Sequence, residues 1–258
     1  MFTFVKRIET KKDSIFYSFI NYKNEILGFG RKHYRYENKI KLIKVDESFN
    51  IIEDNNQLID GEDPRCIIHK EKLYVTDNYA NKQKIYDYEN NKYIKINIQG
   101  KNLSLISHKD ELYFIHSTKP FVIYKLDINN ENIENIVTKQ TTYDVNSEYR
   151  GGTSGYRLKK NPNMYYGFGH RTYYKNNILL HDIFLWIVDF TNEHPSINVI
   201  DVEKPKNAKN ICDPTCVIEI NNKLYLVTAE SDYSWFCQQD YITNVYEITD
   251  NNFLQMVM

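Results

Sequence analysis

The sequence predicts an all-β fold, a five-bladed β-propeller with a central ligand cavity, formed by residues 1–258 as a single domain. Three observations predict it. A strand-like unit recurs five times, polar turns rich in Asn, Asp and Lys separate the strands, and no segment joins a helix cap to apolar residues at helical spacing. The 22 tyrosines and 13 phenylalanines agree with this fold, because aromatic side chains favour strands.

The recurring unit is a polar turn followed by an apolar and aromatic strand. Its copies are NEILGFG, EKLYVTD, DELYFIH, NMYYGFG and NKLYLVT, at residues 24–30, 71–77, 110–116, 163–169 and 222–228. The second and fifth copies agree further, since each follows Asp-Pro, a cysteine and an apolar pair. Repeats of roughly 40–60 residues, each with about four strands, are typical of propeller blades.

The segments between these copies supply the remaining strands. Residues 84–98 predict a hairpin that turns at Glu89, Asn90 and Asn91. Residues 115–128 and 179–191 continue the third and fourth units in the same alternating pattern. Residues 2–8 form a further strand, which we expect to pair with the last blade, close the ring and remove exposed sheet edges.

Composition excludes several classes of partner. The chain carries 33 basic and 34 acidic residues and a net charge of −1, so it has no overall field that attracts nucleic acid or an anionic membrane. No apolar run approaches the roughly 18 residues that cross a bilayer, and residues 1–12 lack the pattern of a signal peptide. We therefore expect a soluble, cytoplasmic protein without nucleic acid or membrane as a partner. The sequence leaves the oligomeric state open.

We expect neither a metal ion nor a cofactor. Cys212 and Cys216 are close in sequence, but no second pair of cysteines or histidines has the spacing of a zinc site. Together with Cys66 and Cys237 they are expected to be buried free thiols. The segment GGTSG at residues 151–155 lacks the Lys-Ser/Thr end of a phosphate-binding loop.

Four charged or glycine-rich segments precede predicted inner strands. They are GEDPR at residues 61–65, GKN at 100–102, RGGTSG at 150–155 and CDPT at 212–215. Each is also a turn sequence, and a charged loop is the simplest interpretation of any one of them. In a propeller, however, the innermost strands all start at one end of the central channel. We therefore predict that these segments face one shared site.

At these segments the chain resembles the five-bladed propeller family of inverting β-mannoside phosphorylases and related β-mannosyltransferases. The resemblance runs from about Ile26 to Asp232 and rests on GEDPR before a strand and on residues 101–120, 150–170 and 223–232. It implies glycosyl transfer on mannoside-like sugars, with a sugar, a sugar phosphate or inorganic phosphate as the partner. It also implies that Asp63 and Arg65 shape the sugar subsite.

The same resemblance assigns roles to further residues. Arg150 and Lys119 match positions that contact phosphate, and Asp232 matches one that binds sugar hydroxyls. The general acid of the family falls on Asn102, which follows Lys101. An amide cannot give a proton to a departing glycosidic oxygen. Either another acid acts, or the donor is activated and basic side chains stabilise its phosphate leaving group. The candidates for another acid are Glu62, Asp63, Glu230 and Asp232.

The residues themselves add further candidates. His170 and Arg171 end a strand and are predicted to hold one anion together with Arg150, because a planar guanidinium binds phosphate with two hydrogen bonds. Arg31, in GRKHYRY, is predicted to contact a sugar phosphate, with a solvated hairpin as the alternative. Aromatic side chains offer stacking faces for sugar rings or belong to the core. These are Tyr173, Tyr174, Tyr233 and Trp235.

Three sets of residues make up the predicted site. The catalytic set is Asn102, Asp63 and Asp232. The substrate-binding set is Glu62, Arg65, Lys101, Glu230, Arg31 and Tyr173. The phosphate-binding set is Arg150, Lys119, His170 and Arg171. The alternative is a catalytically silent glycan-binding propeller that kept the cavity and lost the acid, or a propeller that serves only as a scaffold for protein contacts.

Overall fold

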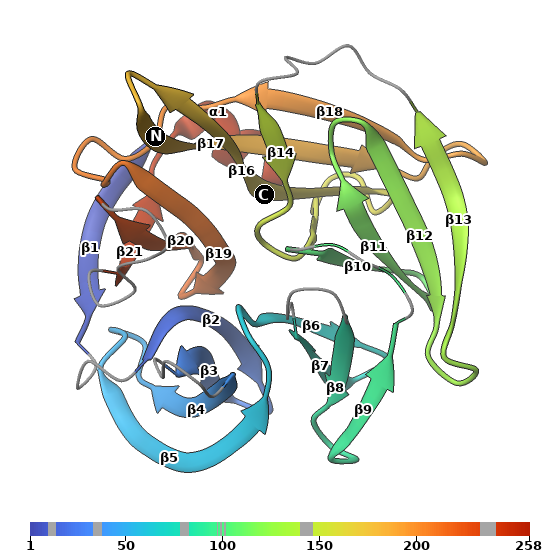
Figure 1. Cartoon of the computed structure of the whole chain (residues 1–258), viewed down its shortest axis with the longest axis horizontal. Helices are drawn as coiled ribbons and strands as arrows, with labels where there is room; N and C mark the ends of the chain where they lie inside the picture. Colours follow the sequence, from blue (N-terminus) through green and yellow to red (C-terminus); the bar gives the residue numbers. More distant parts are fainter. Residues whose placement is uncertain are drawn as a thin grey trace.

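A computed structural model shows five antiparallel sheets arranged around one axis, which confirms the predicted five-bladed β-propeller (Figure 1). The structure describes residues 1–9, 14–32, 38–77, 83–96, 98, 100, 102–139, 147–232 and 241–258. We number the blades in chain order.

The strands of the first three blades follow one another along the chain. Blade 1 contains β2 (Ser14–Tyr22), β3 (Glu25–Lys32), β4 (Lys39–Val45) and β5 (Ile51–Asp60). Blade 2 contains β6 (Arg65–His69), β7 (Lys72–Asp77), β8 (Lys84–Asp87) and β9 (Lys92–Lys95). Blade 3 contains β10 (Ser104–His108), β11 (Glu111–Ser117), β12 (Phe121–Asp127) and β13 (Asn132–Lys139).

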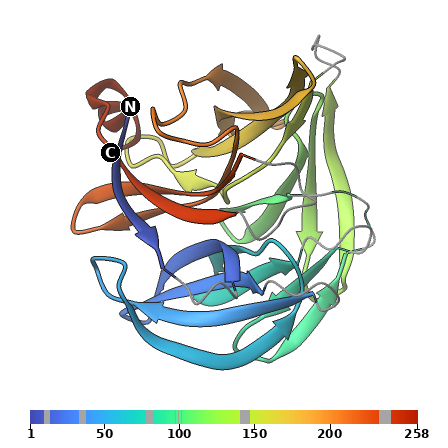
Figure 2. The same cartoon turned by 60° about the vertical axis from the view of Figure 1, so that its left-hand side comes forward.

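The last two blades differ in how they are built. In blade 4, the short strands β14 (Glu148–Arg150) and β15 (Tyr156–Arg157) both pair with β16 (Met164–Lys175), and β17 (Ile178–Asp189) and β18 (Ser196–Asp201) follow. Blade 5 contains β19 (Ile211–Ile220), β20 (Lys223–Ser231) and β21 (Ile242–Ile248). Its outer strand is β1 (Phe2–Ile8), so the predicted closure of the ring by residues 2–8 is confirmed (Figure 2).

The recurring sequence unit lies in the second strand of every blade, in β3, β7, β11, β16 and β20. Two-residue turns with positive φ at both positions join several of these strands to a neighbour, for example at Asn176-Asn177 and Asn221-Asn222. Such turns match the twist of the strands that they connect, and Asn tolerates the left-handed conformation. The predicted turn at residues 89–91 is confirmed between β8 and β9.

The core lies between adjacent blades. Phe168 and Leu185 of blade 4 pack against Cys212, Val217 and Leu226 of blade 5 in one such cluster. Cys66, Cys212 and Cys216 are buried and free, as predicted. Cys237 lies outside the described residues. No described helix is long and apolar enough to cross a membrane.

The expectation that helix caps are absent is wrong at the C-terminus. Helix α1 (Asn251–Val257) starts after Asp250, whose carboxylate accepts a hydrogen bond of 2.9 Å from the backbone N–H of Phe253. Phe253 and Val257 are buried, and the ring of Phe253 packs edge-on against that of Tyr166. Two buried positions in a helix of seven residues are too short a pattern for helical periodicity to be recognised.

Candidate functional site

The inner strands of blades 2 and 3 begin with the same backbone conformation. Gly61 and Gly100 have φ of 150° and 155°, and Asp63 and Asn102, each two residues later, have φ of 45° and 57°. A Cβ on Gly61 would lie 2.9 Å from Cγ of Asp77. Both glycines are therefore required by conformation, and Asp63 and Asn102 occupy equivalent positions in neighbouring blades.

Gly151 and Gly152 join the starts of the other inner strands. A Cβ on Gly151 would lie 2.4 Å from the carbonyl oxygen of Asn102 in blade 3, and one on Gly152 would lie 2.8 Å from Cγ of Pro214 in blade 5. The guanidinium of Arg65 in blade 2 donates from Nε to the carbonyl oxygen of Gly152. The four segments singled out in the sequence therefore meet at one end of the channel.

Arg65 is a buried cation that holds this end of the channel together. Arg65 is 1% exposed, and its Nη1 donates hydrogen bonds of 3.2 Å and 2.9 Å to the carbonyl oxygens of Asp63 and Pro64. Burial lowers the pKa of its guanidinium, although the nearby Asp63 and Asp213 carboxylates oppose this. Because three carbonyl oxygens occupy its donors, Arg65 fixes the backbone on which the site is built.

Arg31 binds the two carboxylates of the GEDPR segment. Its guanidinium lies 3.0 Å from Oε1 of Glu62 and 3.1 Å from Oδ1 of Asp63. Burial lowers the pKa of Arg31, but the charges of Asp63 and Glu62 outweigh burial and raise it above its usual value. The backbone N–H of Glu62 donates to Oδ1 of Asp77 at 2.9 Å. Ion pairs with Arg31 of β3 thus connect the carboxylates that precede β6 to blade 1.

Two histidines and an aspartate form a buried cluster between blades 4 and 5. Nδ1 of His181 lies 2.6 Å from Oδ1 of Asp213, and Nδ1 of His170 lies 3.6 Å from the same oxygen. The two imidazole rings stack with centroids 4.8 Å apart. Burial raises the pKa of Asp213, but the neighbouring His181 and His170, together with the hydrogen bond from His181, outweigh burial and lower it below its usual value.

Sequence reasoning did not find this cluster. His181 lies on β17 and Asp213 on β19, and only the packing of blade 4 against blade 5 brings them together. One signal was available, because Asp213 occupies the Asp-Pro position that matches Asp63 in the repeat. His181 carries no motif of its own.

The cluster has the composition of a metal site, since its three ligand atoms lie within 4.8 Å of one another. Its geometry favours a hydrogen-bonded pair instead. An imidazole nitrogen binds a metal ion in the plane of its ring, and the two rings here are nearly parallel, at 16°. An ion shared by both rings would lie outside the plane of at least one of them.

Arg150 and His170 share one face of blade 4. They lie opposite each other in the register of β14 and β16. The side chain of Arg150 is 31% exposed, and its Nη2 lies 2.5 Å from Oε2 of Glu148. Burial lowers the pKa of His170 to about 3. His170 is therefore neutral at neutral pH, and it can offer an anion a hydrogen bond but no charge.

Arg171 points to the other face of blade 4, because successive residues of a strand point to opposite faces. Lys119, between β11 and β12 of blade 3, forms a β-bridge with Tyr149. Nζ of Lys119 lies 4.5 Å above the ring of Tyr149, the register partner of Arg171. Arg171 stacks on Tyr173 and lies 3.7 Å from Oδ2 of Asp182. The phosphate-binding set therefore divides into two groups on opposite faces of the sheet.

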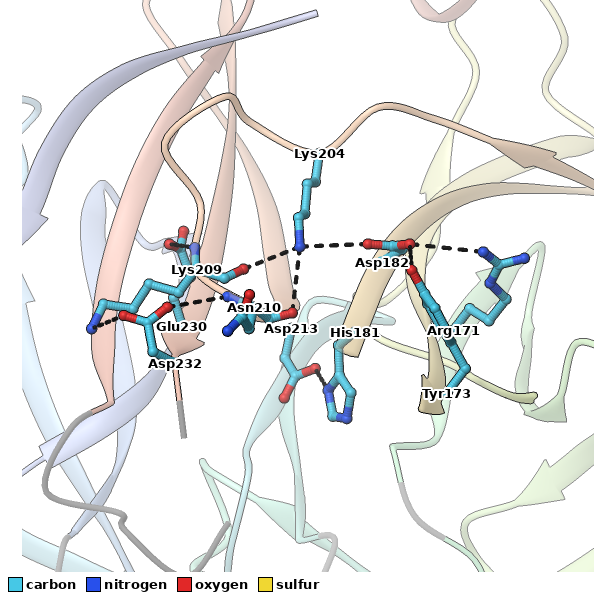
Figure 3. Close-up of polar contacts among 10 residues, drawn as sticks. All are labelled: Arg171, Tyr173, His181, Asp182, Lys204, Lys209, Asn210, Asp213, Glu230 and Asp232. Carbon is cyan, nitrogen blue, oxygen red and sulfur yellow. Dashed lines mark hydrogen bonds and ion pairs between the residues drawn. The ribbon is translucent and has the colours of Figure 1, made fainter. Parts of the chain in front are cut away.

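Figure 3 shows that Arg171 belongs to a network of polar contacts around residues 204–210. Tyr173 donates a 2.6 Å hydrogen bond to Asp182, and Nζ of Lys204 lies 3.5 Å from the same carboxylate. Asp232 accepts a hydrogen bond from the backbone of Asn210 and pairs with Lys209 at 3.3 Å. These residues hold the segment that runs from blade 4 to blade 5.

Glu230 is buried within blade 5. It accepts hydrogen bonds of 2.6 Å from Thr228, 2.7 Å from Tyr246 and 3.1 Å from the backbone of Lys209. Three donors on one carboxylate indicate a structural role. Lys101, Tyr233 and Trp235 lie outside the described residues.

A cavity of about 500 Å³ lies at the opposite end of the channel. It is lined mainly by apolar and aromatic residues of all five blades, among them Ile67, Tyr156 and Ile218. None of the predicted site residues that the structure describes lines this cavity. The charged cluster and the apolar cavity are thus separate features of the channel.

Comparisons with known proteins agree with the fold. No protein-family model matches the chain, and no curated protein matches it in sequence. Mannose phosphorylase MPT-4 from Leishmania mexicana, solved in complex with phosphate ion, matches with a TM-score of 0.65 at 11% identity, over 92% of this chain and 87% of its own. An exo-β-1,3-galactanase from Phanerochaete chrysosporium matches with 0.64 at 8% identity, over 96% and 64%. A glycosyl hydrolase from Bacteroides ovatus matches with 0.59 at 9% identity, over 90% and 84%. Identities this low show the shared propeller fold alone.

Proposed function

We propose that this protein transfers a glycosyl group between a sugar phosphate and an acceptor hydroxyl, with mannoside-like sugars as its substrates. The observation that carries the proposal is the convergence of Arg31, Asp63, Asn102, Arg150 and Asp213 at one end of the channel. The mannose phosphorylase that shares this fold, solved in complex with phosphate ion, is the precedent for the proposal. Carboxylates and amides bind sugar hydroxyls, and cations bind phosphate.

Within this site, Arg150 is the residue best placed to hold the anion. It is partly exposed, it has a donor fork suited to phosphate, and Glu148 is its ion-pair partner among the described residues. His170 adds a neutral hydrogen-bonding group on the same face. Asp63, Glu62 and Asn102 would bind the sugar, with Arg31 holding the two carboxylates.

The state of the carboxylates favours a donor that already carries phosphate. Arg31 pairs with both Glu62 and Asp63, so both carboxylates are engaged in ion pairs. Glu230 is engaged by three donors inside blade 5. Asn102 carries no acidic proton. A phosphate leaving group held by Arg150 needs no protonation, whereas a sugar alkoxide does.

Replacing Arg150 tests the proposed anion site. Arg150→Met keeps the bulk of the side chain and deletes its charge. We expect it to weaken binding of inorganic phosphate and of mannose 1-phosphate by about 1–3 kcal/mol, the scale of one charge-assisted hydrogen bond. Thermal shift and calorimetric titration measure this loss. Arg157→Met is the matched control, because Arg157 is exposed and lines the cavity at the opposite end of the channel.

Equal phosphate affinity in wild type and Arg150→Met would contradict the anion role. Turnover is measured separately, as phosphate released from mannose 1-phosphate in the presence of mannose or mannobiose. Sugar binding without turnover on any activated donor would favour the catalytically silent glycan-binding propeller.

A further inference from the structure

We infer that His181 is the proton-transferring base of this site and that Asp213 is the positioning residue that orients it. This inference rests on the glycosyl transfer proposed above. It starts from a buried pair to which the proposed function gives no chemical role, in which Nδ1 of His181 lies 2.6 Å from Oδ1 of Asp213. The two residues are 8% and 7% exposed.

The hydrogen bond to Asp213 decides which nitrogen of His181 can accept a proton. A carboxylate accepts hydrogen bonds and donates none, so Nδ1 of the neutral imidazole must carry the hydrogen. The lone pair is then on Nε2, the nitrogen that acts as a base. In Figure 3, Nε2 lies on the side of the ring away from Asp213.

The imidazole is held from several directions. The backbone N–H of His181 donates a 3.0 Å hydrogen bond to the carbonyl oxygen of Asn210, which also accepts from Nζ of Lys204 at 3.4 Å. The ring stacks on that of His170. A base held in this way needs little reorganisation before it reacts.

His181 also lies on the face of blade 4 that carries the proposed anion site. Arg150 pairs with His170 in register, and His181 pairs with Thr172, which is two residues from His170 on β16. Side chains two residues apart in a strand share a face. The side chains of His181 and Arg150 therefore lie on one face of blade 4, and both are near His170.

The proposed step balances in atoms and electrons. The acceptor hydroxyl gives its proton to Nε2 of His181 while its oxygen forms a bond to C1 of the sugar. The bond between C1 and the phosphate oxygen breaks, and phosphate leaves with the electron pair beside Arg150. The imidazolium, hydrogen-bonded to Asp213, then releases the proton to phosphate or solvent. In the reverse direction the same nitrogen supplies the proton that Asn102 cannot.

The test compares His181→Gln, His181→Ala and Asp213→Asn in the full-length protein, with mannose 1-phosphate as donor and mannose as acceptor. We expect His181→Gln to lower kcat by about 100-fold or more, the contribution of a general base, with KM and phosphate affinity within about twofold of wild type. Added imidazole should restore part of the activity of His181→Ala. His194→Gln is the matched control, since His194 is exposed.

A spectroscopic measurement on the wild-type protein is independent of any folding defect in the variants. Imidazole ¹⁵N signals at pH 8 should show His181 protonated at Nδ1 and bare at Nε2, with this preference lost in Asp213→Asn. A bare Nδ1 in the wild type would overturn the inference.

The kinetic outcomes separate the inference from the proposed function. One outcome is that the wild type transfers sugar and that kcat of His181→Gln is within about threefold of the wild-type kcat. Because a general base contributes far more than threefold, this would overturn the role of His181 and leave the proposed function standing. Wild-type protein that transfers no sugar from any phosphate donor would overturn the proposed function, and this assignment with it.

Discussion

At the scale of single residues, burial decides which form of the His170 imidazole the folded protein holds. The free-energy cost of removing a charged imidazolium from water exceeds its favourable interaction with the nearby Asp213 carboxylate, so burial lowers the pKa of His170 to about 3. In the unfolded chain the pKa of histidine is about 6.5. Between these values the unfolded chain binds a proton that the folded protein does not, and the free energy of unfolding falls as the pH falls.

The expected slope from His170 alone approaches about 1.4 kcal/mol per pH unit below pH 6. Asp213, whose pKa is also lowered on folding, acts in the same direction, but only below about pH 4, where a free aspartate takes up its proton. Urea unfolding between pH 7 and 4.5 therefore leaves out most of the contribution of Asp213. We expect His170→Gln to flatten this dependence by about 1 kcal/mol per pH unit.

The exposed His194 supplies the control for this measurement, because His194→Gln should keep the wild-type slope. Burial also lowers the pKa values of His69 and His108, but both remain in wild type and variant and their effects cancel. Parallel curves for wild type and His170→Gln would contradict the neutral, buried imidazole.

At the scale of elements, helix α1 offers a direct test of how a short segment is held in place. Asp250→Ala removes the carboxylate that accepts from the backbone N–H of Phe253. Loss of an N-cap costs about 1 kcal/mol. Asn251→Ala, an exposed neighbour, should change the free energy of unfolding by much less. Equal urea midpoints for Asp250→Ala and wild type would show that the contacts of Phe253 and Val257 suffice.

The same scale explains what the sequence could and could not predict. Strands were predictable because each blade repeats one pattern, and the equivalence of Asp63 and Asn102 follows from glycines two residues before each. Contacts between blades were not predictable, because the local sequence pattern does not indicate which strand faces pack against each other. Arg171 follows His170 in sequence, yet it lies on the opposite face of β16. His181 meets Asp213 only through packing of blade 4 against blade 5.

At the scale of the whole molecule, the ring depends on one strand from the N-terminus. β1 pairs with β21 from Phe2 opposite Ile248 to Ile8 opposite Thr243, so the two ends of the chain are joined within blade 5. The ring of Phe2 packs edge-on against Phe168 of blade 4, and Ile8 is buried. This single pairing covers the edge of β21 and holds the first and last parts of the chain together.

Deleting residues 1–8 should therefore destabilise the entire propeller and not blade 5 alone. The deletion removes two packed apolar side chains, worth about 1.5–3 kcal/mol each when fully buried, and uncovers β21 as a free edge. We expect the free energy of unfolding to fall by about 3 kcal/mol or more, with one cooperative transition at a lower urea concentration. The uncovered edge should also cause association that increases with protein concentration, measured by light scattering. Val5→Thr, at an exposed position of the same strand, should leave both measurements near wild type. A truncated chain that unfolds at the wild-type midpoint and stays monodisperse would show that the interfaces between blades hold the ring closed without β1.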